Sequence, residues 1–106
     1  MTTISKDNKV VTLINIFTVD PKNQQRLVDM LVVATEQAMR HMPGFVTLNI
    51  HKSSDGERVA NYAQWRSRED FEAMLKNPAA LAHMKPITEI AKFDAHVYEV
   101  METIAV

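Results

Sequence analysis

The sequence predicts an α+β fold, a ferredoxin-like βαββαβ plait in which helices cover one face of an antiparallel sheet. Two observations support this prediction. The chain has 106 residues, which is the length of one domain. Along it, segments of strand and helix character follow one another in the order strand, helix, strand, strand, helix, strand, which is the split βαβ connectivity of this fold.

The boundary between the first strand and the first helix can be recognised in the sequence. Residues 10–19 are rich in Val, Ile, Thr and Phe, which are enriched in strands. Asp20 can cap a helix and Pro21 suits its first position, so we expect a helix from there to about Met42. The apolar residues of this helix fall at helical spacing: Leu27, Met30, Leu31, Ala34 and Ala38.

A hairpin is predicted after this helix. Pro43 and Gly44 form a helix-stopping pair. Residues 45–52 and 58–66 have strand character, and the polar stretch 53–56 between them ends in Asp-Gly, which favours a tight turn. These two strands should therefore pair antiparallel.

The rest of the chain should hold the second helix and the last strand. Ser67 is a suitable N-cap for a helix that reaches about Lys76. Its inward-facing residues would be Phe71, Met74 and Leu75. Asn77-Pro78 should break this helix, a short helix at 79–84 and a linking stretch should follow, and residues 93–101 should form the fourth strand.

The first strand is apolar on both of its faces. One alternation carries Val11, Leu13 and Phe17, and the other carries Val10, Ile14 and Ile16. A strand that is apolar on both faces is normally buried on both. Because the helices cover only one face of the plait, we expect a second copy of the chain to cover the other, in a twofold homodimer resembling an α/β-barrel.

Composition argues against several classes of partner. The formal net charge is −1 and the basic residues form no run, so there is no electrostatic footprint for nucleic acid. Residues 1–9 are polar, and no apolar stretch is long enough to span a membrane. We therefore expect a flexible segment at 1–9, a single domain at 10–106, and a soluble cytoplasmic protein without a membrane partner.

The sequence also lacks the motifs of common cofactor sites. There is no cysteine, and therefore no thiolate nucleophile or thiolate metal site. The histidines include no i, i+2 or i, i+4 pair of the kind that binds zinc. Gly44 and Gly56 each lie in a turn-forming pair, so Gly-rich phosphate and dinucleotide loops are absent. We therefore expect no metal and no cofactor.

A candidate binding site lies in the third expected strand. Asn61, Ala63 and Trp65 share one face, with the first and last about 13 Å apart at roughly 3.3 Å per residue. The indole offers a wall, the methyl group an open floor, and the amide a hydrogen-bond donor and acceptor. This pattern suits a flat, mostly apolar ligand. The same spacing also fits a core tryptophan beside an amide that the backbone satisfies.

The run from Val59 to Trp65, VANYAQW, is preceded by His51 and by the Ser54-Asp55-Gly56 turn. This segment resembles the antibiotic biosynthesis monooxygenase family, and within it the small anthrone monooxygenases of aromatic polyketide pathways. The resemblance extends from the Val-rich first strand into the second helix. It implies a dimeric ferredoxin-like enzyme that uses molecular oxygen without metal, flavin or haem.

The resemblance also implies roles for individual residues. Asn61 and Trp65 match the pair regarded as central to oxygenation in those enzymes, and His51 matches a histidine of their pocket. Phe71 stands where the relatives have a tyrosine, and the region where they have an arginine offers only His83, Met84 and Lys85 here. The candidate substrate-binding residues are therefore Asn15, which interrupts the apolar first strand, together with Ala63, Phe71, His83 and Lys85.

Cofactor-free oxygenation makes clear demands on a protein. Triplet oxygen reacts slowly with closed-shell molecules, so the substrate must become a good one-electron donor on deprotonation, as anthrones and dihydroxyarenes do. The protein has to bind the flat ring, stabilise its enolate or phenolate, and exclude bulk water. Asn61 is the candidate donor to the oxyanion and Trp65 the stacking wall. His51 is the candidate base, since an imidazole can accept a proton at neutral pH.

Three alternatives stay open. The haem-degrading branch of the same family has an asparagine matching Asn15, a histidine near the position of His83, and a tryptophan where this chain has Met74. A further branch acts on quinols or small signalling molecules. The dimeric plait can also serve as a ligand-binding module without catalysis.

Overall fold

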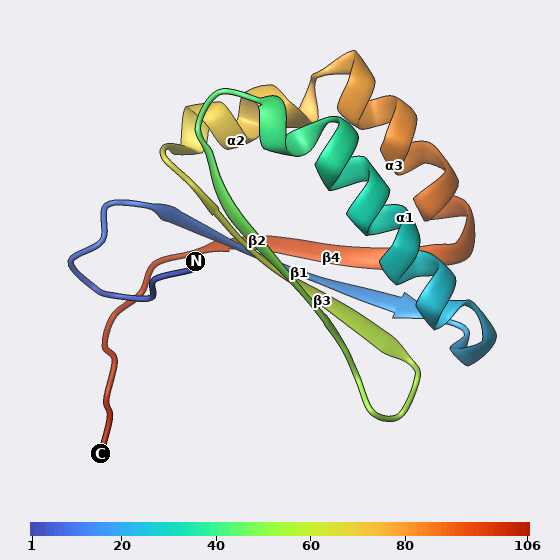
Figure 1. The fold of residues 1–106 in the computed structure, drawn as a ribbon, viewed down its shortest axis with the longest axis horizontal. Coiled ribbons are helices and arrows are strands. Elements are labelled where there is room, and N and C mark those ends of the chain that lie inside the picture. The colour runs from blue at the N-terminus through green and yellow to red at the C-terminus, as the bar shows by residue number, and fades with distance from the viewer.

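The computed structural model describes residues 1–106 and has the predicted α+β ferredoxin-like architecture. Its single antiparallel sheet has 4 strands in the order β2-β3-β1-β4, and the helices lie on one face of it (Figure 1). The strands are β1 (Val11–Val19), β2 (Phe45–Lys52), β3 (Arg58–Trp65) and β4 (Ala91–Tyr98). The α-helices are α1 (Gln24–Gln37), α2 (Arg68–Leu75) and α3 (Pro78–Ile90), and the short 3₁₀ helices are η1 (Pro21–Asn23) and η2 (Met39–His41).

The expected cap residues act as caps. The Asp20 side chain accepts a hydrogen bond from the backbone N–H of Lys22, and Pro21 opens η1. Ser67 Oγ accepts from the N–H of Asp70 at 3.1 Å and starts α2. These bonds satisfy N–H groups that have no partner within the helix, which is why these residue types begin helices. Both boundaries therefore follow from local sequence.

Two of the helix predictions were wrong in extent. The helix expected to reach Met42 ends as an α-helix at Gln37 and continues only as the short η2. The helix expected at 79–84 instead runs through to Ile90 with Pro86 inside it, so there is no linking stretch. Pro86 is exposed, which lets water reach the carbonyl group that its missing N–H leaves free. Since α3 continues to Ile90, β4 follows it directly and spans Ala91–Tyr98 instead of the expected 93–101.

Two apolar clusters fix the helices on the sheet. One consists of Phe17, Val19, Leu27, Leu31, Val59 and Ile87, and it joins α1 and the C-terminal half of α3 to the centre of the sheet. The other consists of Leu13, Ala63, Trp65 and Phe71, and it joins α2 to the opposite end. The layer of helices is thus attached to the sheet at both ends. Between the two clusters, a space remains above the middle of the strands.

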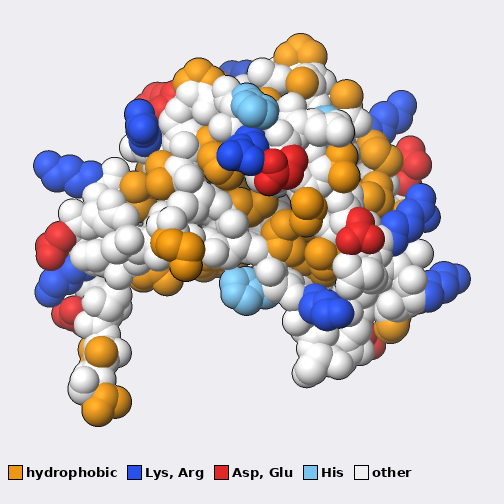
Figure 2. Space-filling view, viewed as in Figure 1, with side chains coloured by type: hydrophobic (Ala, Val, Ile, Leu, Met, Phe, Trp, Pro, Cys, Tyr) orange, Lys and Arg blue, Asp and Glu red, His pale blue; other side chains and the backbone are white.

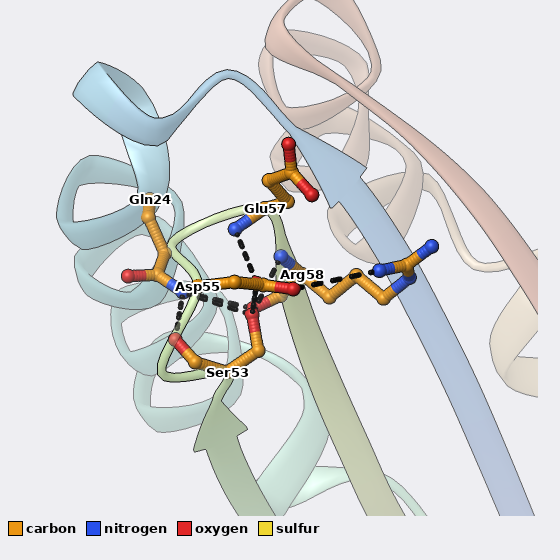
Figure 3. A network of polar contacts seen from close by, with 5 residues as sticks. All are labelled: Gln24, Ser53, Asp55, Glu57 and Arg58. Atoms are coloured by element: carbon orange, nitrogen blue, oxygen red, sulfur yellow. Dashed lines mark hydrogen bonds and ion pairs between the residues drawn. The ribbon is translucent and has the colours of Figure 1, made fainter.

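A polar network ties the start of α1 to the β2–β3 hairpin (Figure 3). Gln24 Nε2 donates to the carbonyl oxygens of Ser53 at 2.9 Å and Arg58 at 3.0 Å. Within the turn, Asp55 accepts from Ser53 Oγ at 2.6 Å and from the N–H of Glu57 at 2.9 Å. These hydrogen bonds, the one from Ser53 first, hold the pKa of the Asp55 carboxyl below its ordinary value. The network fixes the first turn of α1 against the hairpin.

The second face of the sheet is free of helices. Ile14 and Ile16 of β1 are half-buried there, which agrees with a strand that is apolar on both faces. The N-terminal segment, expected to be flexible, contacts part of this face through hydrogen bonds from Asn49 to Thr2 Oγ1 and from Gln64 to the carbonyl of Thr3. The rest of the face lines a hollow between the C-terminal segment and the hairpin (Figure 2).

None of the helices combines the length and the apolar character that crossing a bilayer requires.

Gly44 occupies a site that tolerates no side chain. Its φ of +86° lies in the left-handed region, and its carbonyl accepts a hydrogen bond at 2.8 Å from the N–H of Arg66. A Cβ at this position would collide with the Asp70 carboxylate of α2. The turn before β2 and the first turn of α2 therefore pack so closely that only glycine fits between them.

We predict that Gly44→Ala lowers the free energy of unfolding by about 2–5 kcal/mol, the sum of roughly 1–2 for the left-handed backbone and 1–3 for the collision. Gly56→Ala is the matched control, because Gly56 also has a positive φ of +81° but a Cβ there meets Pro21 only at 3.3 Å. Urea denaturation of both variants measures the difference. Equal losses, or a loss from Gly44→Ala that is just as large in an Asp70→Gly background, which removes the colliding Cβ and carboxylate, would show that the collision does not matter.

Candidate active site

A cavity of about 460 Å³ lies between the sheet and the helices. Its volume is in the range of small-molecule binding sites, roughly 300–1,000 Å³. Of its 21 lining residues 16 are hydrophobic, so it favours an apolar occupant. Residues of α3, of β4 and of the middle strands β1 and β3 all line it. Figure 1 shows that α3 diverges from β4 with distance from their junction at Ile90–Ala91.

The register between β1 and β3 builds the floor of the cavity. Leu13 pairs with Ala63 and Asn15 pairs with Asn61 across the two strands, and all of them line the cavity. Directly opposed residues have Cα atoms only about 4.5–5.5 Å apart. The two amides therefore lie side by side, with the small Ala63 next to them. Asn61, Ala63 and Trp65 share the face that the sequence predicted.

The two amides are buried without hydrogen-bond partners for their oxygens. Asn15 is 8% exposed and Asn61 is 9% exposed. The Oδ1 atom of each is inaccessible and accepts no hydrogen bond. A buried polar group without a partner costs about 1–3 kcal/mol, and such groups are rare in native proteins. The alternative of a core asparagine satisfied by the backbone therefore does not describe Asn61. Both asparagines line the cavity, and their amide N–H groups, which also have no hydrogen-bond partner, are the part of each side chain that an occupant can reach.

An aromatic cluster closes one end of the cavity. Trp65 is 2% exposed, and its ring centroid lies 5.6 Å from that of Phe45 and 6.2 Å from that of Phe71. All three rings line the cavity. Trp65 is thus a core residue and a cavity wall at once. The Phe71 ring that stands in place of a tyrosine contributes surface but no hydroxyl group.

The two histidines predicted for the site lie elsewhere. His51 is exposed and pairs with Ala60, which puts it on the second face of the sheet, away from the cavity. A register irregularity between Phe45 and Thr47 is the cause. Phe45 faces the cavity, and a regular strand would place His51 on that side too, but one extra residue moves every later side chain to the opposite face.

The cavity-facing residues of α3 form a stripe that sequence reasoning only partly found. They are Leu81, Met84, Lys85 and Thr88, at helical spacing. Lys85 belongs to this stripe as expected, whereas His83 is not among the lining residues. The stripe was missed because the helix was expected to stop near Met84. Extending the 3.6-residue period past Pro86 would have revealed it.

The cavity has a simple electrostatic character. Lys85 is its only charged lining residue, and no Asp, Glu or His contributes to its wall. No group of three or more His, Asp or Glu side chains converges anywhere in the structure. The polar groups available to an occupant are therefore the amides of Asn15 and Asn61, the Lys85 ammonium, and the hydroxyl groups of Thr35 and Thr88.

The chain is similar to known proteins in sequence and in fold. The chain is 52% identical over 83 residues to a tetracenomycin-F1 monooxygenase from Streptomyces glaucescens, covering 78% of this chain and 74% of that protein. The monooxygenase from the gene ActVA-Orf6 of Streptomyces coelicolor, solved with nanaomycin D, superposes with a TM-score of 0.84 at 22% identity, covering 97% of this chain and 99% of the other.

A second solved structure has the same fold. SnoaB, a cofactor-independent oxygenase from Streptomyces nogalater, gives a TM-score of 0.74 at 21% identity, covering 92% of this chain and 98% of the other. The sequence model of the family described as antibiotic biosynthesis monooxygenase matches residues 10–86. With most of the chain inside that match, the protein belongs to the antibiotic biosynthesis monooxygenase family.

Proposed function

We propose that this protein is a cofactor-independent monooxygenase that oxidises a flat anthrone- or quinol-like aromatic to a quinone with molecular oxygen. Its family and its relatives make it an oxidoreductase. The substrate class is inferred mainly from one observation: the amides of Asn15 and Asn61 lack hydrogen-bond partners in a mostly apolar cavity with aromatic walls. A fused aromatic ring with oxygen on its edge matches both features.

The cavity suits a planar ring. Trp65 and Phe71 provide aromatic faces at one end and Phe17 and Phe93 provide them at the other. The small Ala63 leaves room above the floor between Trp65 and the amides. An edge carbonyl or enolate oxygen of the ring can accept from the amide N–H groups of Asn15 and Asn61. Bound in this way, the ligand satisfies amide donors that have no partner in the empty protein.

The chemistry balances without a cofactor. An anthrone loses a proton from its central CH₂ to give an enolate, which passes one electron to O₂ and then combines with the superoxide to form a C–O bond. Loss of water from the resulting hydroperoxide leaves the quinone carbonyl, so CH₂ and O₂ become C=O and H₂O. The two amides stabilise the enolate oxygen, and such a preorganised donor accelerates a reaction by about 10²- to 10³-fold.

The proton has no carboxylate or imidazole to accept it in the cavity. His51, the base suggested by the resemblance, is on the other face of the sheet. We therefore assign it no role in proton transfer within its own chain. The first proton instead passes to water at the mouth of the cavity. The amides lower the free energy of this deprotonation by stabilising the anion that remains.

The haem-degrading alternative gains no support from the geometry. It required a histidine beside the cavity, and His83 does not line it. Met74 lines the cavity at the position where that branch has a tryptophan.

Asn61→Leu should lower kcat by about 10²-fold, because an apolar side chain of similar size cannot stabilise the enolate oxygen. The thermal midpoint should hold or rise, since the substitution removes a buried acceptor that has no partner. Steady-state oxygen uptake with an anthrone and a thermal melt measure both effects.

The matched control for this variant is Asn49→Leu, on the opposite face of the sheet. Asn49 Nδ2 donates to Thr2 Oγ1 at 2.6 Å and to the carbonyl of Tyr62 at 3.3 Å. The Asn49→Leu variant should lose stability and keep activity, whereas Asn61→Leu should keep stability and lose activity. Normal turnover by Asn61→Leu, or a stability loss as large as that of Asn49→Leu, would remove the basis for a functional amide.

We also predict that the second face of the sheet is a homodimer interface, because Ile14, Ile16 and Tyr62 are only half-buried on it. Ile16→Lys should then convert a dimer into a monomer at micromolar concentration, as measured by light scattering. Val32→Lys is the control, since Val32 is an equally apolar residue exposed on α1. A monomeric parent protein, or dissociation by the control as well, would contradict this interface.

A further inference from the structure

We infer that the helical side of the cavity is a sulfoxidation site, in which the thioethers of Met39, Met74 and Met84 accept oxygen from a peroxide formed during turnover. This inference rests on the proposed function, because that reaction supplies the peroxide. It adds a covalent modification of the cavity wall, which limits the number of turnovers that one molecule completes.

The first observation is the placement of the methionines. Three of the seven in the chain line the cavity, and each comes from a different element of the helical layer: Met39 from η2, Met74 from α2 and Met84 from α3. Met74 packs against the cluster that contains Trp65, and Met84 packs against the cluster that contains Phe17. Thioethers therefore lie toward both ends of the cavity, across from the sheet that holds the two amides.

The second observation is that sulfur is the group on this side of the cavity that a peroxide oxidises. A binding cavity covers roughly 70–90% of the surface of its ligand, so the face of a ring turned away from the sheet contacts the helical layer. On that layer the other lining side chains are aliphatic, apart from Phe71, Lys85 and two threonines. A thioether takes up oxygen readily to give a sulfoxide, and the chain has no cysteine to compete with it.

The oxygen transfer balances in atoms and electrons. A sulfur lone pair attacks the distal oxygen of the anthrone hydroperoxide, an S–O bond forms and the O–O bond breaks. The proximal oxygen leaves as an alkoxide and takes up the proton of the transferred oxygen. The hydroperoxide is thereby reduced to a hydroxyanthrone, and the thioether is oxidised to a sulfoxide. This step competes with the loss of water that yields the quinone, and the polar sulfoxide makes the wall less suited to an apolar ring.

The chain carries its own reference methionines. Met30 and Met42 are half-buried and pack against the same two clusters, but neither lines the cavity. Met1 and Met101 are far more exposed, at 115% and 74%. A dissolved oxidant should attack the exposed pair first, because susceptibility follows accessibility. An oxidant that forms inside the cavity should reverse this order.

The test is turnover of 1,8-dihydroxyanthrone under ¹⁸O-labelled O₂, with catalase and superoxide dismutase present to remove oxidants that escape into solution. Peptide mass spectrometry should find about 10-fold more labelled sulfoxide at the three lining methionines than at Met30 and Met42, because a peroxide held in the cavity has a high effective concentration there. Labelled sulfoxide and labelled hydroxyanthrone should form in equal amounts. Hydrogen peroxide added without substrate should instead oxidise Met1 and Met101 first.

A pair of double variants tests the effect on activity. Met74→Leu combined with Met84→Leu removes two of the acceptors at similar side-chain volume. This variant should complete at least about twofold more turnovers before half of its activity is lost, since leucine cannot take up oxygen. Met30→Leu combined with Met42→Leu is the matched control, and its loss of activity per turnover should equal that of the parent.

The outcomes separate this inference from the proposed function. Quinone formation with no labelled sulfoxide, or with as much label at Met30 and Met42 as at the lining methionines, would overturn the sulfoxidation site and leave the proposed function standing. A parental loss of activity per turnover in the Met74→Leu, Met84→Leu variant would do the same. If the parent forms neither quinone nor hydroxyanthrone, the proposed function fails, and this inference fails with it.

Discussion

The antiparallel register between β1 and β3 determines where every group of the candidate site lies. It sets Asn15 opposite Asn61 and Leu13 opposite Ala63 on the face that the helices cover. Since side chains alternate along a strand, a shift of either strand by one residue would turn its amide to the other face of the sheet and separate the pair. The register is held by apolar residues on the same face, Phe17 and Val59 at one end and Trp65 at the other, which are almost fully buried.

The cavity exists because the two apolar clusters do not merge. Ile87 fixes the end of α3 on the sheet, and Phe71 fixes α2 at the far end, so the helical layer rises between them. A larger residue than Ala63 on the floor would close this space. The protein therefore keeps two features that reduce stability, an unfilled volume and two amides without partners, at the same place. Such a coincidence is expected of a binding site, where function opposes stability.

The sequence predicted the parts of the fold that local patterns specify. The order of strands and helices along the chain, the caps at Asp20 and Ser67, and the shared face of Asn61 and Trp65 depend on alternation and on residue type, and they are confirmed. His51 was expected in the site from the resemblance alone, and the bulge in β2, which leaves no trace in composition, turns its side chain to the second face of the sheet in this chain. Lys85 was expected, but the rest of the stripe on α3 was missed because the helix was expected to end near Met84; the helix continues through the exposed Pro86, which is tolerated because water can satisfy the freed carbonyl.

The central claim is that an aromatic substrate reacts with oxygen in the space above Ala63. The most direct test measures oxygen uptake and quinone absorbance together, with 1,8-dihydroxyanthrone, for EDTA-dialysed parent protein and for Ala63→Leu. The account predicts that the parent consumes one O₂ per quinone formed, without added flavin, nicotinamide or metal. It predicts that Ala63→Leu stays folded, with an unchanged or higher thermal midpoint, and loses the reaction because leucine fills the cavity floor. Oxidation by Ala63→Leu at the parental rate, or loss of the parent's activity on dialysis against the chelator, would contradict it.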